Sequence, residues 1–372
     1  MIVVYGQAGS GKTSLLISTL RERQEKGLTC VVLTPTHSSK RNIENKIECR
    51  ISTIYSFYRI DYVNNIVVGM NKTDLERTNV ILIDEFSLIP KDIFRKILHQ
   101  TPSSIEIIAF GDPGQLNPVN INKKYISLNS LKRYLSENMD YDVIAHHSSS
   151  VFSLKSFRMS DKRLLPENRR AGDSISNLIH SLFFTNDEVK LETIGPSRLV
   201  NLIQSGKWTL IASTYKLLDQ AYSRLNFTTQ SESKELIVKC TSMTPHLNSI
   251  HFRVDDKYII GERCDRLKNG EVVTCKSIDG EVLLEDESGE VFTYDGSFSI
   301  LPQFLITAHK SQGMTIENVI VELDDLFESS MLYTMVTRAS KSLLFYQSNI
   351  GDMSWRDHLA STRKLLKFYG YK

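Results

Sequence analysis

Short apolar, β-branched runs alternate with longer amphipathic stretches along most of the chain. Runs of this kind are typical of strands buried on both faces of a parallel sheet, and the stretches between them suit crossover helices. The expected strands of a first lobe are residues 2–5, 29–33, 80–83 and 105–110. The expected strands of a second lobe are residues 208–212, 303–306, 318–321 and 343–346, with a helix at 216–225. The pattern therefore predicts two α/β lobes.

Two stretches break this rhythm. Residues 55–70 place Asn64-Asn65 between flanks rich in Ile, Val and Tyr, and this predicts a β-hairpin because Asn tolerates the left-handed turn conformation. Residues 258–299 contain closely spaced turn signals, among them Asn269-Gly270 and Asp279-Gly280. We expect a small meander or barrel of short strands there. Both stretches are interpreted as β insertions into the α/β lobes.

Composition narrows the class of protein without identifying it. A length of 372 residues suggests two to three domains, and 45 Lys and Arg against 43 Asp and Glu give a net charge of +2. This balance gives no global sign of a polyanionic partner, so any nucleic-acid surface must be local. The basic segment 148–170, interleaved with Phe152 and Phe157, fits either a solvated linker or a strand-binding surface.

The cysteines and the apolar runs indicate the compartment. Five scattered cysteines without a CxxC pair favour neither a zinc site nor a disulfide framework, which suits a reducing cytoplasm. The N-terminus lacks the basic segment of a secretory signal, and no run approaches the length of a membrane helix. We expect a cytoplasmic protein without a membrane partner.

The first chemical motif is a phosphate loop. Residues 6–13 match GxxxxGK[ST] between an expected strand and an expected helix, which is the context that this motif requires. Its glycines let backbone N–H groups surround the phosphates, its lysine reaches the β- and γ-phosphates, and its last hydroxyl binds Mg²⁺. The residues expected to hold ATP are Gly6, Gly9, Ser10, Gly11, Lys12 and Thr13, with Thr13 also a metal ligand.

Two further strand ends carry polar groups. The strand at 80–83 is followed by Asp84, placed to hold Mg²⁺, and by Glu85, placed to polarise the attacking water. The strand at 105–110 leads into Gly111-Asp112-Pro113-Gly114-Gln115. This segment is either a plain turn or a site from which Gln115 senses the γ-phosphate. The motifs together predict hydrolysis of a phosphoanhydride.

These motifs and five more occur in an order that resembles the superfamily-1 helicases, and most closely their RecD/Dda-like group. The matching segments are residues 6–13, 34–37, 52–56, 83–85, 111–116, 167–170, 307–313 and 333–339. The resemblance implies two RecA-like lobes, with a strand-separating hairpin in the first and a small SH3-like barrel in the second. It implies domains at 1–163, with the hairpin insertion at about 55–76, and at 164–372, interrupted by the barrel at about 246–301.

The resemblance also implies roles for individual residues. Arg170 and Arg338 correspond to arginine fingers that reach the γ-phosphate, and Gly313 to a residue at the nucleotide. The implied contacts to the backbone of a single strand are Thr36, His37, Thr53, Thr214, His309 and Ser311. The implied strand-separating residues are Tyr62, Val63 and Ile66. Contacts to sugar and phosphate alone make binding largely independent of sequence.

The implied activity is that of an ATP- and Mg²⁺-dependent single-stranded DNA translocase and helicase that moves 5′ to 3′. Single-stranded and forked DNA are the expected partners, with a monomer as the translocating form and with partner proteins from replication or recombination. The compact length and the resemblance together suggest a phage or viral accessory helicase in the host cytoplasm. Two alternatives stay open: a viral RNA helicase, and a nucleic-acid-stimulated ATPase or remodeller that separates no strands.

Overall fold

The computed structural model divides into two compact units. Unit 1 comprises Met1–Glu188, Glu328–Thr337 and Arg356–Lys372, and unit 2 comprises Val189–Phe327 and Arg338–Trp355. The residues that the structure describes are 1–44, 46–61, 66–67, 72–118, 146, 150–154, 161–165, 173–185, 188–225, 234–237, 249–261, 267, 270–348 and 354–371. None of the described helices has the length and apolar character needed to cross a membrane.

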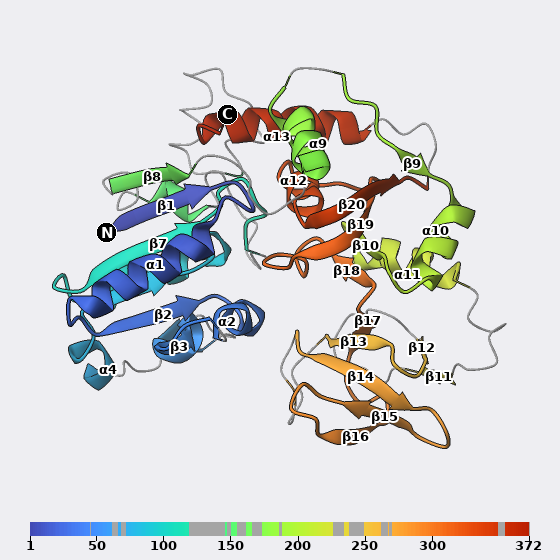
Figure 1. The fold of residues 1–372 in the computed structure, drawn as a ribbon, viewed down its shortest axis with the longest axis horizontal. Coiled ribbons are helices and arrows are strands. Elements are labelled where there is room, and N and C mark those ends of the chain that lie inside the picture. Colours follow the sequence, from blue (N-terminus) through green and yellow to red (C-terminus); the bar gives the residue numbers. More distant parts are fainter. Residues whose placement is uncertain are drawn as a thin grey trace. The chain divides into compact units, whose positions relative to one another are not determined.

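A six-stranded parallel sheet forms the centre of unit 1 (Figure 1). Its strands, in spatial order, are β3 (Arg50–Thr53), β2 (Cys30–Thr34), β6 (Val80–Ile83), β7 (Glu106–Gly111), β1 (Ile2–Gly6) and β8 (Asp161–Leu165). All pairings between these neighbours are parallel. The four strands expected from the apolar runs are therefore confirmed, and β3 and β8 extend the sheet at its two edges.

Helices cover both faces of this sheet because successive strand residues point to opposite sides. The described helices that lie wholly or mostly in unit 1 are α1 (Lys12–Glu25), α2 (His37–Glu44), α3 (Ile54–Phe57), α4 (Lys72–Glu76), η1 (Phe86–Leu88), α5 (Lys91–Gln100), η2 (Val151–Ser153), α9 (Asp173–Phe183), α12 (Met331–Val336) and α13 (Ser354–Phe368). On one face Val4 packs with Leu16 and Leu20 of α1. On the other face Val3 belongs to a core that includes Leu365 of α13. The unit is a doubly wound α/β lobe.

The hairpin expected near Asn64 is present but short. Strands β4 (Ile60–Asp61) and β5 (Ile66–Val67) pair antiparallel, with Ile60 opposite Val67. The N-terminal flank is helical instead of extended, because Thr53 accepts a hydrogen bond from the N–H of Ser56 and caps α3. The hairpin itself is therefore confirmed, and its extent is smaller than the sequence suggested.

Unit 2 contains a second parallel sheet, of five strands. Their spatial order is β18 (Leu305–Thr307), β10 (Thr209–Ala212), β19 (Ile316–Glu322), β20 (Ala339–Tyr346) and β9 (Thr193–Ile194). All four pairings are parallel. Among the described residues of this unit, helices form at α10 (Pro196–Gln204) and α11 (Tyr215–Ser223). The second α/β lobe is confirmed, with all four of its expected strands.

An antiparallel sheet interrupts this lobe between β10 and β18, where the β insertion was expected. Its order is β16 (Val291–Tyr294), β15 (Val282–Glu285), β14 (Val272–Ser277), β13 (Lys257–Ile260) and β17 (Ile300–Pro302). Strands β11 (Lys234–Ile237) and β12 (Ser249–Phe252) form a separate antiparallel pair. The five-stranded sheet is compatible with the predicted SH3-like barrel.

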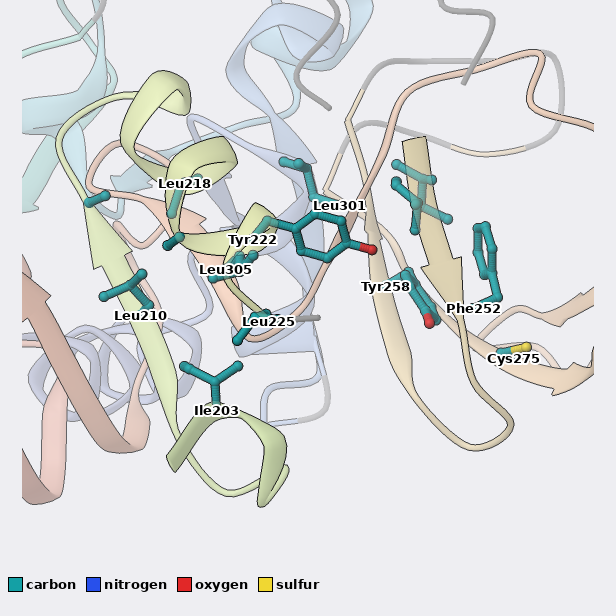
Figure 2. Packing of buried hydrophobic residues seen from close by; sticks show 14 of the residues in the cluster. Ile203, Leu210, Leu218, Tyr222, Leu225, Phe252, Tyr258, Cys275, Leu301 and Leu305 are labelled. Carbon is teal, nitrogen blue, oxygen red and sulfur yellow. The ribbon is translucent and has the colours of Figure 1, made fainter. Parts of the chain in front are cut away.

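One continuous core joins this insertion to the lobe that carries it (Figure 2). Leu218 and Tyr222 of α11 belong to the same buried cluster as Phe252 and Tyr258. The hydroxyl of Tyr222 also accepts a hydrogen bond of 2.6 Å from the N–H of His251 in β12. Shared burial of this kind makes the insertion an integral part of unit 2.

The compact units differ from the domain limits at residues 163 and 164 that the sequence suggested. That boundary falls inside β8, which pairs with β1 along the edge of the first sheet. Residues 328–337 and 356–372 also belong to unit 1, although we expected both in the second lobe. Their assignment follows from packing, because Leu365 and Tyr369 of the last segment lie in the core of unit 1.

Candidate active site

The phosphate loop links β1 to α1 and has the backbone of an anion-binding loop. Gly9 and Gly11 adopt φ values of +82° and +87°, a left-handed conformation that suits glycine. Gly11 is the N-cap of α1 and makes no side-chain cap hydrogen bond, so no capping side chain competes with an anion at this helix N-terminus. A Cβ at Gly6 would lie 2.9 Å from the Cβ of Leu165. The loop therefore requires glycine at these positions.

Lys12 is folded into this loop. Its Nζ donates hydrogen bonds of 2.8 Å to the carbonyl of Gly6 and 2.7 Å to the carbonyl of Gln7. The side chain of Ser10 is also buried, and within the described part of the chain its hydroxyl has no hydrogen-bond partner. Thr13 follows in the first turn of α1. A cation, a buried hydroxyl without a described partner and the N-terminus of α1 thus surround the place where phosphates are expected.

Asp84 and Glu85 follow β6 as predicted. The N–H of Asp84 donates 2.9 Å to the carbonyl of Leu33 on the neighbouring strand, which fixes the residue at the end of the sheet. Burial, together with the negative charge of Glu85, raises the pKa of the Asp84 carboxyl to about 7. Glu85 has a φ of +48°, a strained value for a residue with a side chain. Its Oε2 is buried and accepts no hydrogen bond from any described residue.

Gln115 lies in the turn after β7. Its side chain is 3% exposed, and its Nε2 donates 3.0 Å to Oδ2 of Asp112. Its Oε1 is buried without a donor among the residues that the structure describes. A plain surface turn would leave this side chain in water, so burial with an unused acceptor favours a functional role.

Sheet order brings these motifs to one edge. Strand β7 lies between β6 and β1, and all three run parallel, so the phosphate loop, Asp84 and Gln115 follow their carboxyl ends. The hydroxyl of Thr13 and the carboxylate of Asp84 are hard oxygen donors, which suit Mg²⁺ when phosphate oxygens and water complete its coordination. The described residues contain no group of three or more His, Cys, Asp and Glu side chains that could hold a metal ion.

Three threonines expected to contact a nucleic acid have structural partners here. Thr36 Oγ1 lies 2.9 Å from Ser39 Oγ and accepts from the N–H of Ser39 at the start of α2. Thr53 caps α3, and Thr214 caps α11 by accepting 3.4 Å from the N–H of Leu217. These hydroxyls hold helix N-termini, and contact with a strand stays a prediction for them.

The remaining predicted contacts lie in two places. His37 is the first residue of α2, and its side chain lies outside the described part of the structure. His309 is half-buried in unit 2, after β18. Ser311 is fully buried and donates 2.7 Å to the carbonyl of Ala308, so its hydroxyl supports the turn. Gly313 ends this segment with a φ of +77°.

The predicted arginine fingers and pin are only partly described. The Arg338 side chain is 1% exposed, and its carbonyl accepts 2.9 Å from the N–H of Ile316 within unit 2. Arg170, Tyr62 and Val63 lie outside the described residues, and Ile66 begins β5. The roles assigned to these side chains stay predictions.

Sequence reasoning missed the group that holds Gln115. The sequence pattern places Asp112 only in a turn. In the structure Asp112 is fully buried and accepts a hydrogen bond from Nε2 of Gln115. The hydroxyl of Tyr333, in α12, accepts 3.1 Å from the N–H of Ala8 in the phosphate loop. The short separation of Asp112 and Gln115 in the sequence could have indicated their contact. No local sequence pattern indicates the contact between Tyr333 and Ala8.

Comparison with known proteins agrees with the two lobes. Residues 1–120 match the family model described as AAA domain, and residues 302–346 match the UvrD-like helicase C-terminal domain. The chain is 31% identical over 133 residues to the ATP-dependent DNA helicase dda of Enterobacteria phage T4. That match covers 34% of this chain and 30% of the phage protein.

Longer matches exist at lower identity. The chain is 22% identical over 396 residues to the ATP-dependent DNA helicase Pif1 of Campylobacter jejuni, which covers 91% of this chain and 86% of that protein. The structure of Bacteroides Pif1 bound to ssDNA superposes with a TM-score of 0.61 at 17% identity, covering 99% of this chain and 94% of the other. In its motifs and its fold the chain is thus similar to the helicases dda and Pif1.

Proposed function

We propose that this protein is an ATP-dependent DNA helicase that translocates on single-stranded DNA in the 5′ to 3′ direction. The observation that carries the proposal is the sheet edge of unit 1, where the phosphate loop, Asp84, Glu85 and Gln115 meet. The relatives named above, dda and Pif1, are ATP-dependent DNA helicases, and one Pif1 structure holds ssDNA. They support DNA as the partner.

In this proposal the first lobe performs the hydrolysis. Lys12 moves from the carbonyls of Gly6 and Gln7 to the phosphates, where an ammonium neutralises the developing charge. Thr13 and Asp84 hold Mg²⁺, which supplies further neutralisation of that charge when it is bound. Glu85 accepts the proton of the attacking water, because its Oε2 is buried and unused. Arg338 and Arg170 supply guanidinium groups to the transition state.

An unwinding assay with tailed duplexes tests the DNA part of the proposal. Duplexes with a 5′ tail, a 3′ tail or no tail are mixed with the protein, ATP and Mg²⁺, and strand release is followed by fluorescence. We expect release of the 5′-tailed duplex alone. Release only from 3′ tails would contradict the direction, and ATP hydrolysis without any release would favour the remodeller.

The variant Lys12→Ala provides the matched control. It removes the ammonium group but keeps the remaining loop, so binding of single-stranded DNA should persist while ATP hydrolysis is lost. Retained hydrolysis would contradict the assignment of the phosphate loop. Comparing stimulation by single-stranded DNA and single-stranded RNA in the wild type then separates the DNA helicase from the RNA helicase.

The biological setting is the last part of the proposal. A similarity to a phage T4 helicase suits an accessory role in phage replication or recombination within the host cytoplasm. The described cysteines Cys30, Cys49 and Cys275 are free thiols, which suits a reducing compartment.

A further inference from the structure

The carboxylate of Asp112 is the centre of a buried hydrogen-bond network in unit 1. Its Oδ1 accepts 3.0 Å from the N–H of Gly114 and 2.9 Å from the hydroxyl of Tyr371. Its Oδ2 accepts 3.0 Å from Nε2 of Gln115 and 3.2 Å from the hydroxyl of Tyr333. Four donors match the four acceptor sites of a carboxylate, so this group is fully satisfied although it is buried.

This network determines which end of the Gln115 amide faces the site. A carboxylate can only accept hydrogen bonds, so the group directed at Asp112 must be the NH₂ of Gln115. The carbonyl end, Oε1, is therefore directed elsewhere, and it is buried without a donor from the described residues. An acceptor in this position suits a donor that arrives with the substrate, and the attacking water of ATP hydrolysis is such a donor.

Tyr371 reaches Asp112 from a segment far away in sequence. Residue 114 is a glycine, and a Cβ there would lie 2.5 Å from Leu366 of α13 and 3.2 Å from the ring of Tyr371. The absence of a side chain at Gly114 thus lets α13 and Tyr371 pack directly on the turn. Burial and the nearby Asp112 charge raise the pKa of Tyr371 far above its ordinary value, which keeps its hydroxyl a donor.

Tyr333 extends the network to the phosphate loop. Its hydroxyl accepts from the N–H of Ala8 and donates to Asp112, so one oxygen connects the loop to the turn that carries Gln115. The N–H of Leu116, the residue after Gln115, donates a hydrogen bond of 2.9 Å to Oγ1 of Thr334. Two successive residues of helix α12, Tyr333 and Thr334, thereby form hydrogen bonds to this turn.

We propose that Tyr371, through Asp112, is a positioning residue for hydrolysis that orients Gln115 so that its Oε1 accepts a hydrogen bond from the attacking water. The inference rests on the proposed ATPase function. The water oxygen forms a bond to the γ-phosphorus, the bond to the β,γ-bridging oxygen breaks, and its electron pair leaves with ADP. The proton lost by the water passes to Glu85, and Gln115 exchanges none.

The test is steady-state ATP hydrolysis by Tyr371→Phe in the presence of single-stranded DNA. Removing the hydroxyl leaves Oδ1 of Asp112 with one donor fewer and loosens the orientation of Gln115. We expect kcat to fall about tenfold, as for loss of a hydrogen bond to a charged group, while the KM for ATP changes less than about twofold. The matched control is Tyr369→Phe, since Tyr369 is buried on the same segment and its hydroxyl bonds to Ser150.

A double-mutant cycle separates positioning from simple support of the fold. If Tyr371 acts through Gln115, Tyr371→Phe should have no further effect on kcat in a Gln115→Ala background. Equal effects in both backgrounds, an equal loss in Tyr369→Phe, or a wild-type kcat for Tyr371→Phe would each overturn the inference. A wild-type protein without ATPase activity would instead overturn the proposed function.

A second variant covers loss of folding. Should Tyr371→Phe unfold, as judged by its melting curve, Tyr333→Phe removes a donor from the other oxygen of Asp112. The same cycle with Gln115→Ala then applies. An additive effect of Tyr333→Phe would overturn the inference, and a non-additive effect would support it.

Discussion

Both parallel sheets end an interior strand in acidic residues, but the two ends have different surroundings. In unit 1, β6 ends before Asp84 and Glu85, and Oε2 of Glu85 is buried without a described partner. In unit 2, β19 ends in Glu322, followed two residues later by Asp324. Oδ2 of Asp324 accepts 2.8 Å from the N–H of Ser348 and also a hydrogen bond from its hydroxyl, while Oε1 of Glu322 accepts 3.4 Å from the N–H of Asp324.

This difference distinguishes a candidate catalytic site in unit 1 from an acidic cluster with a structural role in unit 2. The acidic groups of unit 1 lie at the edge that also carries a phosphate loop, where Asp84 can hold Mg²⁺ and the unused Oε2 of Glu85 can accept a hydrogen bond from water. In unit 2, Oε1 of Glu322 and Oδ2 of Asp324 accept hydrogen bonds from their own chain, and burial raises the pKa of Glu322 to about 8, with Asp324 adding to the shift. Glu322 is therefore mostly protonated at pH 7. Similar acidic strand ends thus have different roles.

The largest expected effect compares Glu85→Gln with Glu322→Gln. Loss of a general base typically reduces turnover by about 10²–10⁴, so Glu85→Gln should lower kcat by that amount while ATP binding persists. Glu322→Gln should stay within about twofold of the wild type, because a neutral amide resembles the protonated acid already present. Steady-state ATPase assays check both variants. A large loss in Glu322→Gln would make the second cluster catalytic and remove the contrast.

A smaller effect concerns the pH dependence of stability. Burial raises the pKa of Glu322 to about 8 in the folded protein, whereas in the unfolded chain the pKa has its ordinary value of 4.5. Between these pH values the unfolded chain has lost the proton and the folded protein keeps it, so stability falls as pH rises and then levels off above about 8. Glu322→Gln removes this contribution. Its unfolding free energy relative to the wild type should rise by roughly 3 kcal/mol between pH 5 and 8.

Chemical denaturation at a series of pH values measures this effect. The matched control is Glu317→Gln, on the same strand but exposed and paired with Lys341. It should show little change with pH in this range, because an exposed ion pair contributes at most about 1 kcal/mol. If the difference in unfolding free energy between Glu322→Gln and the wild type does not change with pH, Glu322 is ionised in the folded protein.

The smallest effect concerns the capping threonines of the two units. Thr53 and Thr214 were expected to contact DNA, and each accepts a hydrogen bond at a helix N-terminus. Thr214→Ala should cost about 1 kcal/mol of stability, and Thr214→Ser should cost only a few tenths because serine also caps. Denaturation curves check the cap, and titration with single-stranded DNA checks the contact. A loss of DNA affinity in Thr214→Ala at unchanged stability would assign the hydroxyl to DNA instead.

Local patterns were sufficient for much of the fold and of the nucleotide site. The apolar runs located eight of the strands because a strand buried on both faces must be apolar along its whole length. They missed β8, whose residues Asp161 to Arg163 are exposed on an edge strand. The phosphate loop was readable because its chemistry depends on glycine, lysine and a hydroxyl at fixed spacing within one turn.

The sequence by itself thus determined two α/β lobes, the β insertions, and Lys12, Asp84 and Glu85 as the chemical groups of one sheet edge. Only the tertiary structure decided that the last segment packs in the core of unit 1 and that Tyr371 and Tyr333 hold Asp112. The reason is physical. Local spacing determines which side chains follow the end of a strand. A contact between residues 112 and 371 depends instead on how separate helices pack, and no local pattern encodes that packing.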